Sequence, residues 1–117
     1  MMKEAQFSRE VTQYLESKGA IVNNQTGSMF SKVGVSDLLV CYKGFFIALE
    51  LKVGSYQPDP LQISYLQKIR EAGGFGLILR DNIQELMVLL HCIDNSVERQ
   101  YKQPDLPEIK VEEIEYD

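Results

Sequence analysis

The segment from Asp37 to Lys52 constrains the fold more than any other part of the chain. It reads DLLVCYKGFFIALELK, two runs of strand-forming residues joined by Lys43-Gly44. Side chains alternate between the two faces of a strand. The second run therefore has one wholly apolar face, and its other face ends in Glu50 and Lys52. An acid and a lysine project from one side of a strand whose composition otherwise indicates burial.

The length of the turn decides which residues face these two. If Lys43-Gly44 is a two-residue hairpin turn, Asp37 lies opposite Glu50, with Cβ atoms ~4.5–5.5 Å apart. Two carboxylates this close repel each other unless positive charge lies between them, and Mg²⁺ or Mn²⁺ suits such a pair. Lys52 is another source of that charge. A three-residue loop would instead shift the pairing by one residue and separate the acids. In a second alternative, Asp37 only starts a strand, and Glu50 and Lys52 form a solvated polar edge.

Helices and further strands are expected around this hairpin, in the order αβββαβα. Apolar spacing predicts a first helix over 4–18, with a short strand at 20–22. Asp59 and Pro60 predict the start of a helix that runs to about Ala72. A buried strand follows at 75–79, and Asp81 is expected to begin the last helix. The residues expected to face inward from that helix are Ile83, Leu86, Met87, Leu90 and Ile93.

This order indicates one α/β domain over residues 1–95, with a mixed central sheet flanked by helices and an acidic extension at 96–117. The net charge of −5 first argues against a nucleic-acid partner. Residues 103–117, however, hold six acids and one base, which leaves 11 acids and 11 bases in residues 1–102. The sequence is compatible with three roles for this tail: a solvated extension, an added edge strand, or a segment that covers basic positions and competes with DNA. The basic positions concerned are Lys32, Lys43, Lys52 and Lys68.

Other features limit the chemistry. No apolar run is long enough to span a membrane, and the first residues lack the apolar core of a signal peptide, so a cytoplasmic protein is expected. His91 is the only histidine, and it is expected to be a partly exposed helical residue. Cys41 is expected to be a small buried side chain rather than a reactive thiol. Zinc sites and nucleophilic triads are therefore disfavoured, which leaves carboxylates, lysines and a hard metal ion.

GVSDLLVCYKGFFIALELK, followed by PLQISYLQKIREAGGFGLIL, resembles the PD-(D/E)XK nuclease superfamily. More closely, it resembles the small phage-type members of the VRR-NUC group, which are similar to Holliday-junction resolvases. The resemblance extends from about Glu4 to Leu79, and it implies a restriction-endonuclease-like αβββαβ core. Ser36 stands where that family more often has proline.

The resemblance also implies roles for individual residues. Asp37 and Glu50 would be metal ligands, together with the backbone carbonyl of Leu51. Lys52 would orient or activate the attacking water, or stabilise charge on the phosphate. Such folds usually recruit a glutamate from the first helix. Glu4 is the first choice because it lies on the apolar stripe, and Glu10, at the edge of that stripe, is the second.

Three further residues have both a functional and a structural interpretation. Gln62 matches a glutamine that the family keeps near its active site, and it is also the third residue of a capping box opened by Asp59. Ser28 and Lys32 resemble a phosphate-contacting loop, and they are equally compatible with an ordinary solvated loop. Glu4 itself would be favourable at a helix N-terminus without any metal.

The implied function is a metal-dependent DNA endonuclease that uses Mg²⁺ or Mn²⁺ and needs no small-molecule cofactor. Branched DNA is the expected partner, with four-way (Holliday) junctions as the preferred substrate and a homodimer as the expected assembly. Two alternatives remain open. The chain could be a flap or other structure-specific nuclease, or a catalytically silent module that binds DNA or a protein.

Overall fold

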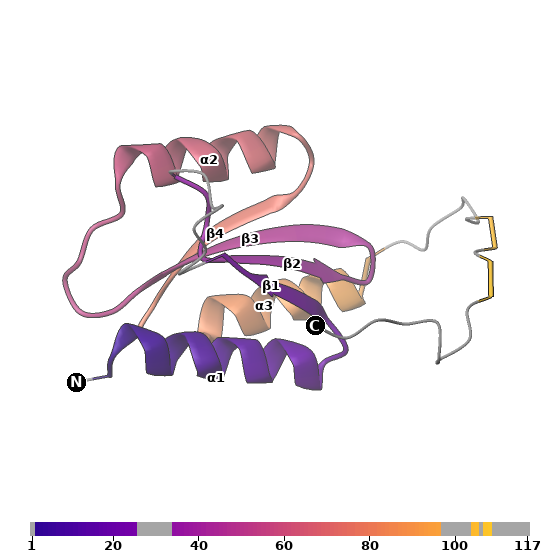
Figure 1. Ribbon diagram of the computed structural model, residues 1–117, viewed down its shortest axis with the longest axis horizontal. Helices are drawn as coiled ribbons and strands as arrows, with labels where there is room; N and C mark the ends of the chain where they lie inside the picture. Colours follow the sequence, from indigo (N-terminus) through magenta and orange to yellow (C-terminus); the bar gives the residue numbers. More distant parts are fainter. Residues whose placement is uncertain (1, 26–33, 97–103, 106, 109–117) are drawn as a thin grey trace.

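The computed structural model describes residues 2–25, 34–96, 104, 105, 107 and 108. Its helices and strands follow the predicted order (Figure 1). They are α1 (Glu4–Ser17), β1 (Ile21–Asn24), β2 (Leu38–Tyr42), β3 (Phe45–Lys52), α2 (Pro60–Glu71), β4 (Phe75–Arg80) and α3 (Gln84–Asp94). No helix among these residues is long and apolar enough to cross a membrane.

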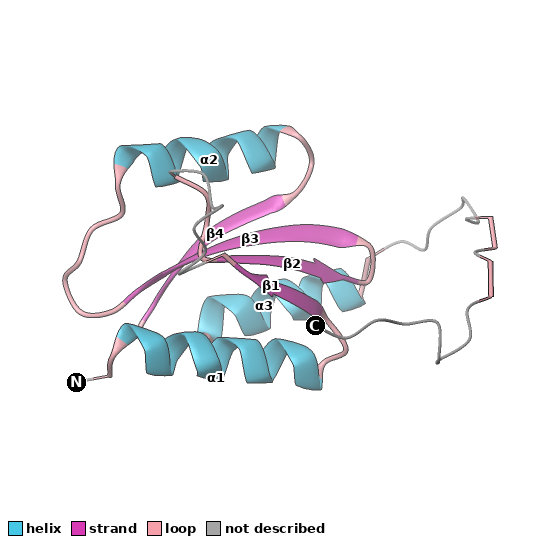
Figure 2. Cartoon of the chain, viewed as in Figure 1, coloured by secondary structure: helices cyan, strands magenta, loops and turns pink. Residues whose placement is uncertain are grey.

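The four strands form one mixed sheet in the order β1-β2-β3-β4. β2 pairs with β1 and with β3 in antiparallel orientation, and β4 pairs with β3 in parallel. The chain needs a crossover to run β4 parallel to β3, and α2 supplies it. Figure 2 shows α2 on one side of the sheet and α1 and α3 on the other. The predicted α/β architecture is confirmed.

The hairpin turn has the length that the sequence predicts. Lys43 and Gly44 both have positive φ, at 48° and 89°, which is the backbone of a type I′ two-residue turn. The strands pair from Tyr42↔Phe45 to Leu38↔Leu49. One step further along this register, Asp37 lies opposite Glu50, as expected.

The main core lies between the sheet and the pair of helices α1 and α3. From α1, Phe7, Val11 and Leu15 are fully buried against it. Leu86, Leu90 and Ile93 contribute from α3. Since alternate residues of β2 and β3 fill this core, Asp37, Glu50 and Lys52 belong to the opposite face, over which α2 lies.

The helix α2 begins with the expected capping box. The Asp59 carboxylate accepts a hydrogen bond from the Leu61 amide at 2.8 Å, and Gln62 Oε1 accepts one from the Asp59 amide at 2.8 Å. The helix then packs closely on β4 at Gly76, which is buried. A Cβ atom at Gly76 would lie 2.7 Å from the carbonyl oxygen of Leu66.

Three expectations are wrong in detail. Asp81 does not begin the last helix, because its φ of 63° is left-handed and the helix begins at Gln84. Met87 is 48% exposed, since the inward stripe of α3 is narrower than expected. Cys41 is exposed rather than buried, because α2 packs on β3 and β4 and leaves the outer face of β2 open. His91 is exposed on α3, as expected.

Replacing Gly76 with alanine is expected to destabilise the protein by ~1–3 kcal/mol, because the added methyl group would push α2 away from β4. The free energy of unfolding, measured in urea, tests this. Cys41→Ala is the control on the same face of the sheet and should change stability by no more than ~0.5 kcal/mol. Equal stability of the two variants would mean that α2 does not depend on this close approach.

Candidate active site

Glu50 is a carboxylate buried inside the sheet. It lies on β3 between β2 and β4, and its side chain is only 1% exposed. Among the described residues, neither carboxylate oxygen has a hydrogen-bond partner of good geometry. Buried polar atoms in proteins are nearly always hydrogen-bonded, and a buried charge is costly unless it is paired or binds a metal. The ionised Glu50 carboxylate therefore requires a nearby cation to offset the cost of its burial.

Asp37 is fixed next to it by two hydrogen bonds. The Leu51 amide donates to Asp37 Oδ2 at 2.8 Å, and the Gln25 amide donates to the Asp37 carbonyl oxygen at 2.8 Å. β2 begins only at Leu38, so the Asp37 side chain takes the place of a strand partner for Leu51.

The direction of the Leu51 amide also explains why the two carboxylates are close. Hydrogen-bonded and non-hydrogen-bonded pairs alternate along an antiparallel ladder. Since Leu51 and Leu49 point their amides toward β2, Asp37 and Glu50 form the intervening non-hydrogen-bonded pair, in which Cα atoms are only ~4.5 Å apart.

The pKa of Glu50 reflects this environment. The pKa of Glu50 is raised to about 7. Burial of the carboxyl group is the largest cause, and the charge and hydrogen bonding of Asp37 also raise the pKa. Lys52 acts in the opposite direction, as its ammonium group lies 3.2 Å from Glu50 Oε1. The Lys52 side chain is 14% exposed, so it connects the buried acid to the surface.

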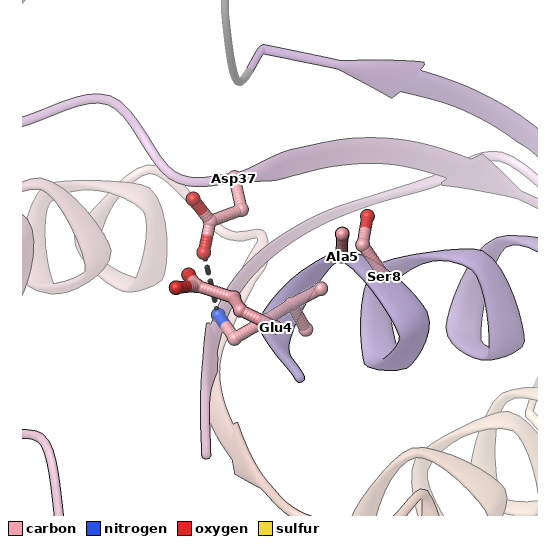
Figure 3. Close-up of a pocket in the computed structure, with 5 residues that line it drawn as sticks. Glu4, Ala5, Ser8 and Asp37 are labelled. Carbon is pink, nitrogen blue, oxygen red and sulfur yellow. Dashed lines mark hydrogen bonds between the residues drawn. The ribbon is translucent and has the colours of Figure 1, made fainter. Parts of the chain in front are cut away.

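A cavity of about 300 Å³ opens beside Asp37. Its lining residues are Glu4, Ala5, Ser8, Asp37 and Leu51. Figure 3 shows the Glu4 and Asp37 side chains extending into this space from α1 and from the start of β2. Within a strand, the carbonyl and amide of one residue point to the same side. The Leu51 carbonyl therefore faces the Asp37 side of β3.

The residues at this place fit a hard divalent cation. Carboxylate and carbonyl oxygens are the donors that Mg²⁺ and Mn²⁺ prefer. Next to Asp37, the two buried Glu50 oxygens have no hydrogen bond of good geometry within the described residues, and one of them lies 3.2 Å from the Lys52 ammonium group. Among the described residues, no three acidic, histidine or cysteine side chains are grouped closely enough to form a complete ligand set. Two protein carboxylates with several waters is a usual arrangement for Mg²⁺.

The structure distinguishes the two helix acids. Glu4 lines the cavity, whereas Glu10 lies almost two turns further along α1 and does not. Glu4 is exposed, so its expected place on the buried stripe is wrong. The buried stripe begins only at Phe7, and Glu4, in the first turn, projects from the end of the helix into the cavity.

The structure gives other contacts for two of the remaining candidates, and the other two are not among the residues it describes. Gln62 uses its carbonyl oxygen in the capping box of α2, so its structural role is confirmed. Lys43 lies at the opposite end of the hairpin and pairs with Asp94 at 2.6 Å, away from the acids. Ser28 and Lys32 lie outside the described residues.

Sequence reasoning missed Ser8, which shares the cavity with Glu4. The available signal was its spacing, because residues four apart lie on the same face of a helix. It also missed Asp81, whose carboxylate accepts a hydrogen bond from the Gly54 amide at 2.9 Å, just beyond Lys52. No local pattern reports that contact between the ends of two strands.

The raised pKa of Glu50 predicts a pH-dependent stability. Glu50 binds its proton more tightly in the folded than in the unfolded chain, so its contribution is present below about pH 4.5 and is lost as the pH rises through about 7. Relative to wild type, Glu50→Gln should gain on the order of 3 kcal/mol between these limits. Urea unfolding with EDTA at several pH values measures this.

Glu85→Gln, at an exposed position on α3, is the matched control, and its stability should follow the wild-type curve. Parallel curves for wild type and Glu50→Gln would contradict the buried, proton-binding state of Glu50.

Comparison with known proteins supports the fold. No protein-family model matches the sequence, and no curated protein matches it. A solved structure described as a VRR_NUC domain is similar, with a TM-score of 0.61 and 22% identity over 78% of this chain and 97% of that one. Hjc, a Holliday junction resolvase of the archaeal hyperthermophile Archaeoglobus fulgidus, is similar with a TM-score of 0.50 and 18% identity over 65% of each chain. The chain therefore has the restriction-endonuclease-like α/β fold that its sequence resemblance implied.

Proposed function

We propose that this chain is a divalent-metal-dependent deoxyribonuclease that hydrolyses phosphodiester bonds in branched DNA, with four-way junctions as its preferred substrate. One observation carries the proposal. Glu50 is buried with both oxygens unsatisfied, beside Asp37 and 3.2 Å from the Lys52 ammonium group. Two neighbouring carboxylates repel each other, so their grouping with a lysine at the end of a sheet favours a functional role over a purely structural one. The nuclease domain is proposed to comprise residues 1–95, with 96–117 as an acidic extension.

In this proposal, Asp37, Glu50 and the Leu51 carbonyl hold Mg²⁺ or Mn²⁺, with Glu4 beside them. When bound, the cation supplies Lewis-acid chemistry, since it offsets phosphate charge and makes water more acidic. It would also compete with the proton on Glu50. Binding should therefore strengthen as the pH rises through about 7.

The chain's own residues have separate roles. Asp37 is held in one orientation by the Leu51 amide, so it is positioned before any ligand arrives. Lys52 lies at the boundary between the buried acid and solvent. There its ammonium group can orient the attacking water and stabilise charge on the phosphate. Hydrolysis adds this water to phosphorus, breaks one P–O ester bond and leaves a phosphate and a hydroxyl end.

The proposed substrate rests on the fold neighbours, one of which is described as a Holliday junction resolvase. A four-way junction must be cut in two strands, so a homodimer with two such sites would suit it. A flap or other structure-specific nuclease would use the same site on a different DNA. Both possibilities are outcomes of the experiment below.

The wild-type protein is expected to cut a synthetic four-way junction with Mn²⁺ or Mg²⁺, and faster than it cuts a flap or linear duplex. Glu50→Gln and Lys52→Ala should each reduce the single-turnover rate by about 100-fold or more. The first removes a proposed ligand of the cation, and the second removes a positive charge at the reacting phosphate. Gel analysis of labelled strands measures the rate. Faster cutting of flaps would change the substrate assignment, and metal-independent or absent cutting would favour a silent binding module.

Glu4 and Glu10 offer a matched comparison on one helix, since both are exposed and only Glu4 lines the cavity. Glu4→Gln should raise the Mn²⁺ concentration needed for half-maximal cutting about tenfold, whereas Glu10→Gln should leave it unchanged. The increase in thermal midpoint on adding Mn²⁺, measured without DNA, should be reduced only in Glu4→Gln. Equal behaviour of the two variants would remove Glu4 from the proposed site.

A further inference from the structure

Directly after the proposed site, the segments that follow β3 and β4 diverge. β3 and β4 run parallel and end side by side at Lys52 and Arg80. From there the chain leads to α2 on one face of the sheet and to α3 on the other (Figure 1). Ligands of open α/β sheets bind at such places, outside the carboxyl ends of strands whose connections diverge. Two strand ends that diverge also separate easily unless something holds them together.

Three hydrogen bonds join the two ends. The Asp81 amide donates to the Lys52 carbonyl oxygen at 3.1 Å. The Gly54 amide donates to Asp81 Oδ1 at 2.9 Å. Arg80 Nη1 donates to the Gly54 carbonyl oxygen at 2.6 Å. Residues 52–54, which begin two positions after Glu50, are thereby tied to residues 80 and 81.

Asp81 is not an ordinary choice for its position. Its φ of 63° is left-handed, a conformation that glycine adopts without cost and other residues adopt rarely, aspartate and asparagine among the more tolerant. Glycine at this position would satisfy the backbone equally well. What aspartate adds is the carboxylate, and that carboxylate is bonded to Gly54.

A helix-capping role does not account for Asp81. The helix α3 begins at Gln84, and the side chain that reaches its first amide is Asn82, whose Oδ1 accepts from the Gln84 amide at 3.0 Å. The Asp81 side chain instead points across to the loop that follows β3. Its contact therefore serves the end of β3 rather than the start of α3.

We propose that Asp81 is a positioning residue that acts through Lys52. Its amide fixes the backbone of Lys52 and its carboxylate fixes Gly54. These contacts hold Lys52 where its ammonium group lies 3.2 Å from Glu50 Oε1. Without the carboxylate, the segment after β3 loosens and Lys52 samples positions away from Glu50. This inference rests on the proposed nuclease function.

Three substitutions at Asp81 separate backbone strain from the carboxylate contact. Asp81→Gly keeps the left-handed backbone and removes the acceptor. Asp81→Asn keeps both, so it should restore the wild-type rate. Asp81→Ala removes both. Since small misplacements of a reacting group are costly, Asp81→Gly should lower the single-turnover cutting rate of a four-way junction in Mn²⁺ about tenfold. DNA affinity, measured by anisotropy in EDTA, should not change.

The decisive test is the same change in a Lys52→Ala background. If Asp81 acts through Lys52, adding Asp81→Gly to Lys52→Ala should lower the residual rate by less than about twofold. Hydrogen exchange at the Gly54 amide should accelerate in Asp81→Gly and remain slow in Asp81→Asn. Asn82→Ala removes the neighbouring cap of α3, and it should lower stability without this loss of rate.

Each result has one meaning. An unchanged rate in Asp81→Gly, with an active wild type, overturns the positioning role and leaves the proposed function intact. An equal tenfold loss in both backgrounds also overturns it, because Asp81 would then act on stability or on another group. An inactive wild type overturns the proposed function and the positioning role with it.

Discussion

The proposed site depends on the pairing register of β2 and β3. A type I′ turn at Lys43-Gly44 sets that register, and the five pairs that follow it bring Asp37 to a position opposite Glu50. Because side chains alternate along a strand, a slip of one residue would move Glu50 to the other face relative to its partner. The turn lies at the far end of the hairpin, where Lys43 and Tyr42 both donate to Asp94 of α3 at 2.6 Å.

The rest of the fold keeps the Glu50 carboxylate buried, at a place with almost no access to water. Glu50 lies between two neighbouring strands under α2, and burial raises its pKa to about 7. An unpaired charge there would be costly, so the site is stable in the absence of a cation only because Glu50 can hold a proton and Lys52 lies nearby. Core packing of α1 brings Glu4 to the cavity that it shares with Asp37 and Leu51. Stability of the fold therefore favours a protonated Glu50, whereas the proposed metal binding requires Glu50 to be ionised.

Much of this arrangement was predictable because it depends on local patterns. The boundaries of β3 and the capping box of α2 follow from alternation and from short-range hydrogen bonding. The exposure of Cys41 and Met87 was not predictable, because it depends on how far α2 covers β2 and on the rotation of α3 against the core. The wrong start for α3 has the same origin. Asp81 is a good helix-starting residue by local chemistry, but a contact with Gly54, 27 residues away, holds it in a turn.

The sequence by itself determined the order of the elements, the hairpin register and the pairing of Asp37 with Glu50, because each follows from periodicity and turn chemistry within about 16 residues. Only the tertiary structure decided which of Glu4 and Glu10 reaches the cavity, that Lys43 lies away from the acids, and that Asp81 ties the end of β4 to the segment after Lys52. These features depend on where separate elements meet in space. Packing of the helices on the sheet sets those meeting points, and no local pattern encodes them.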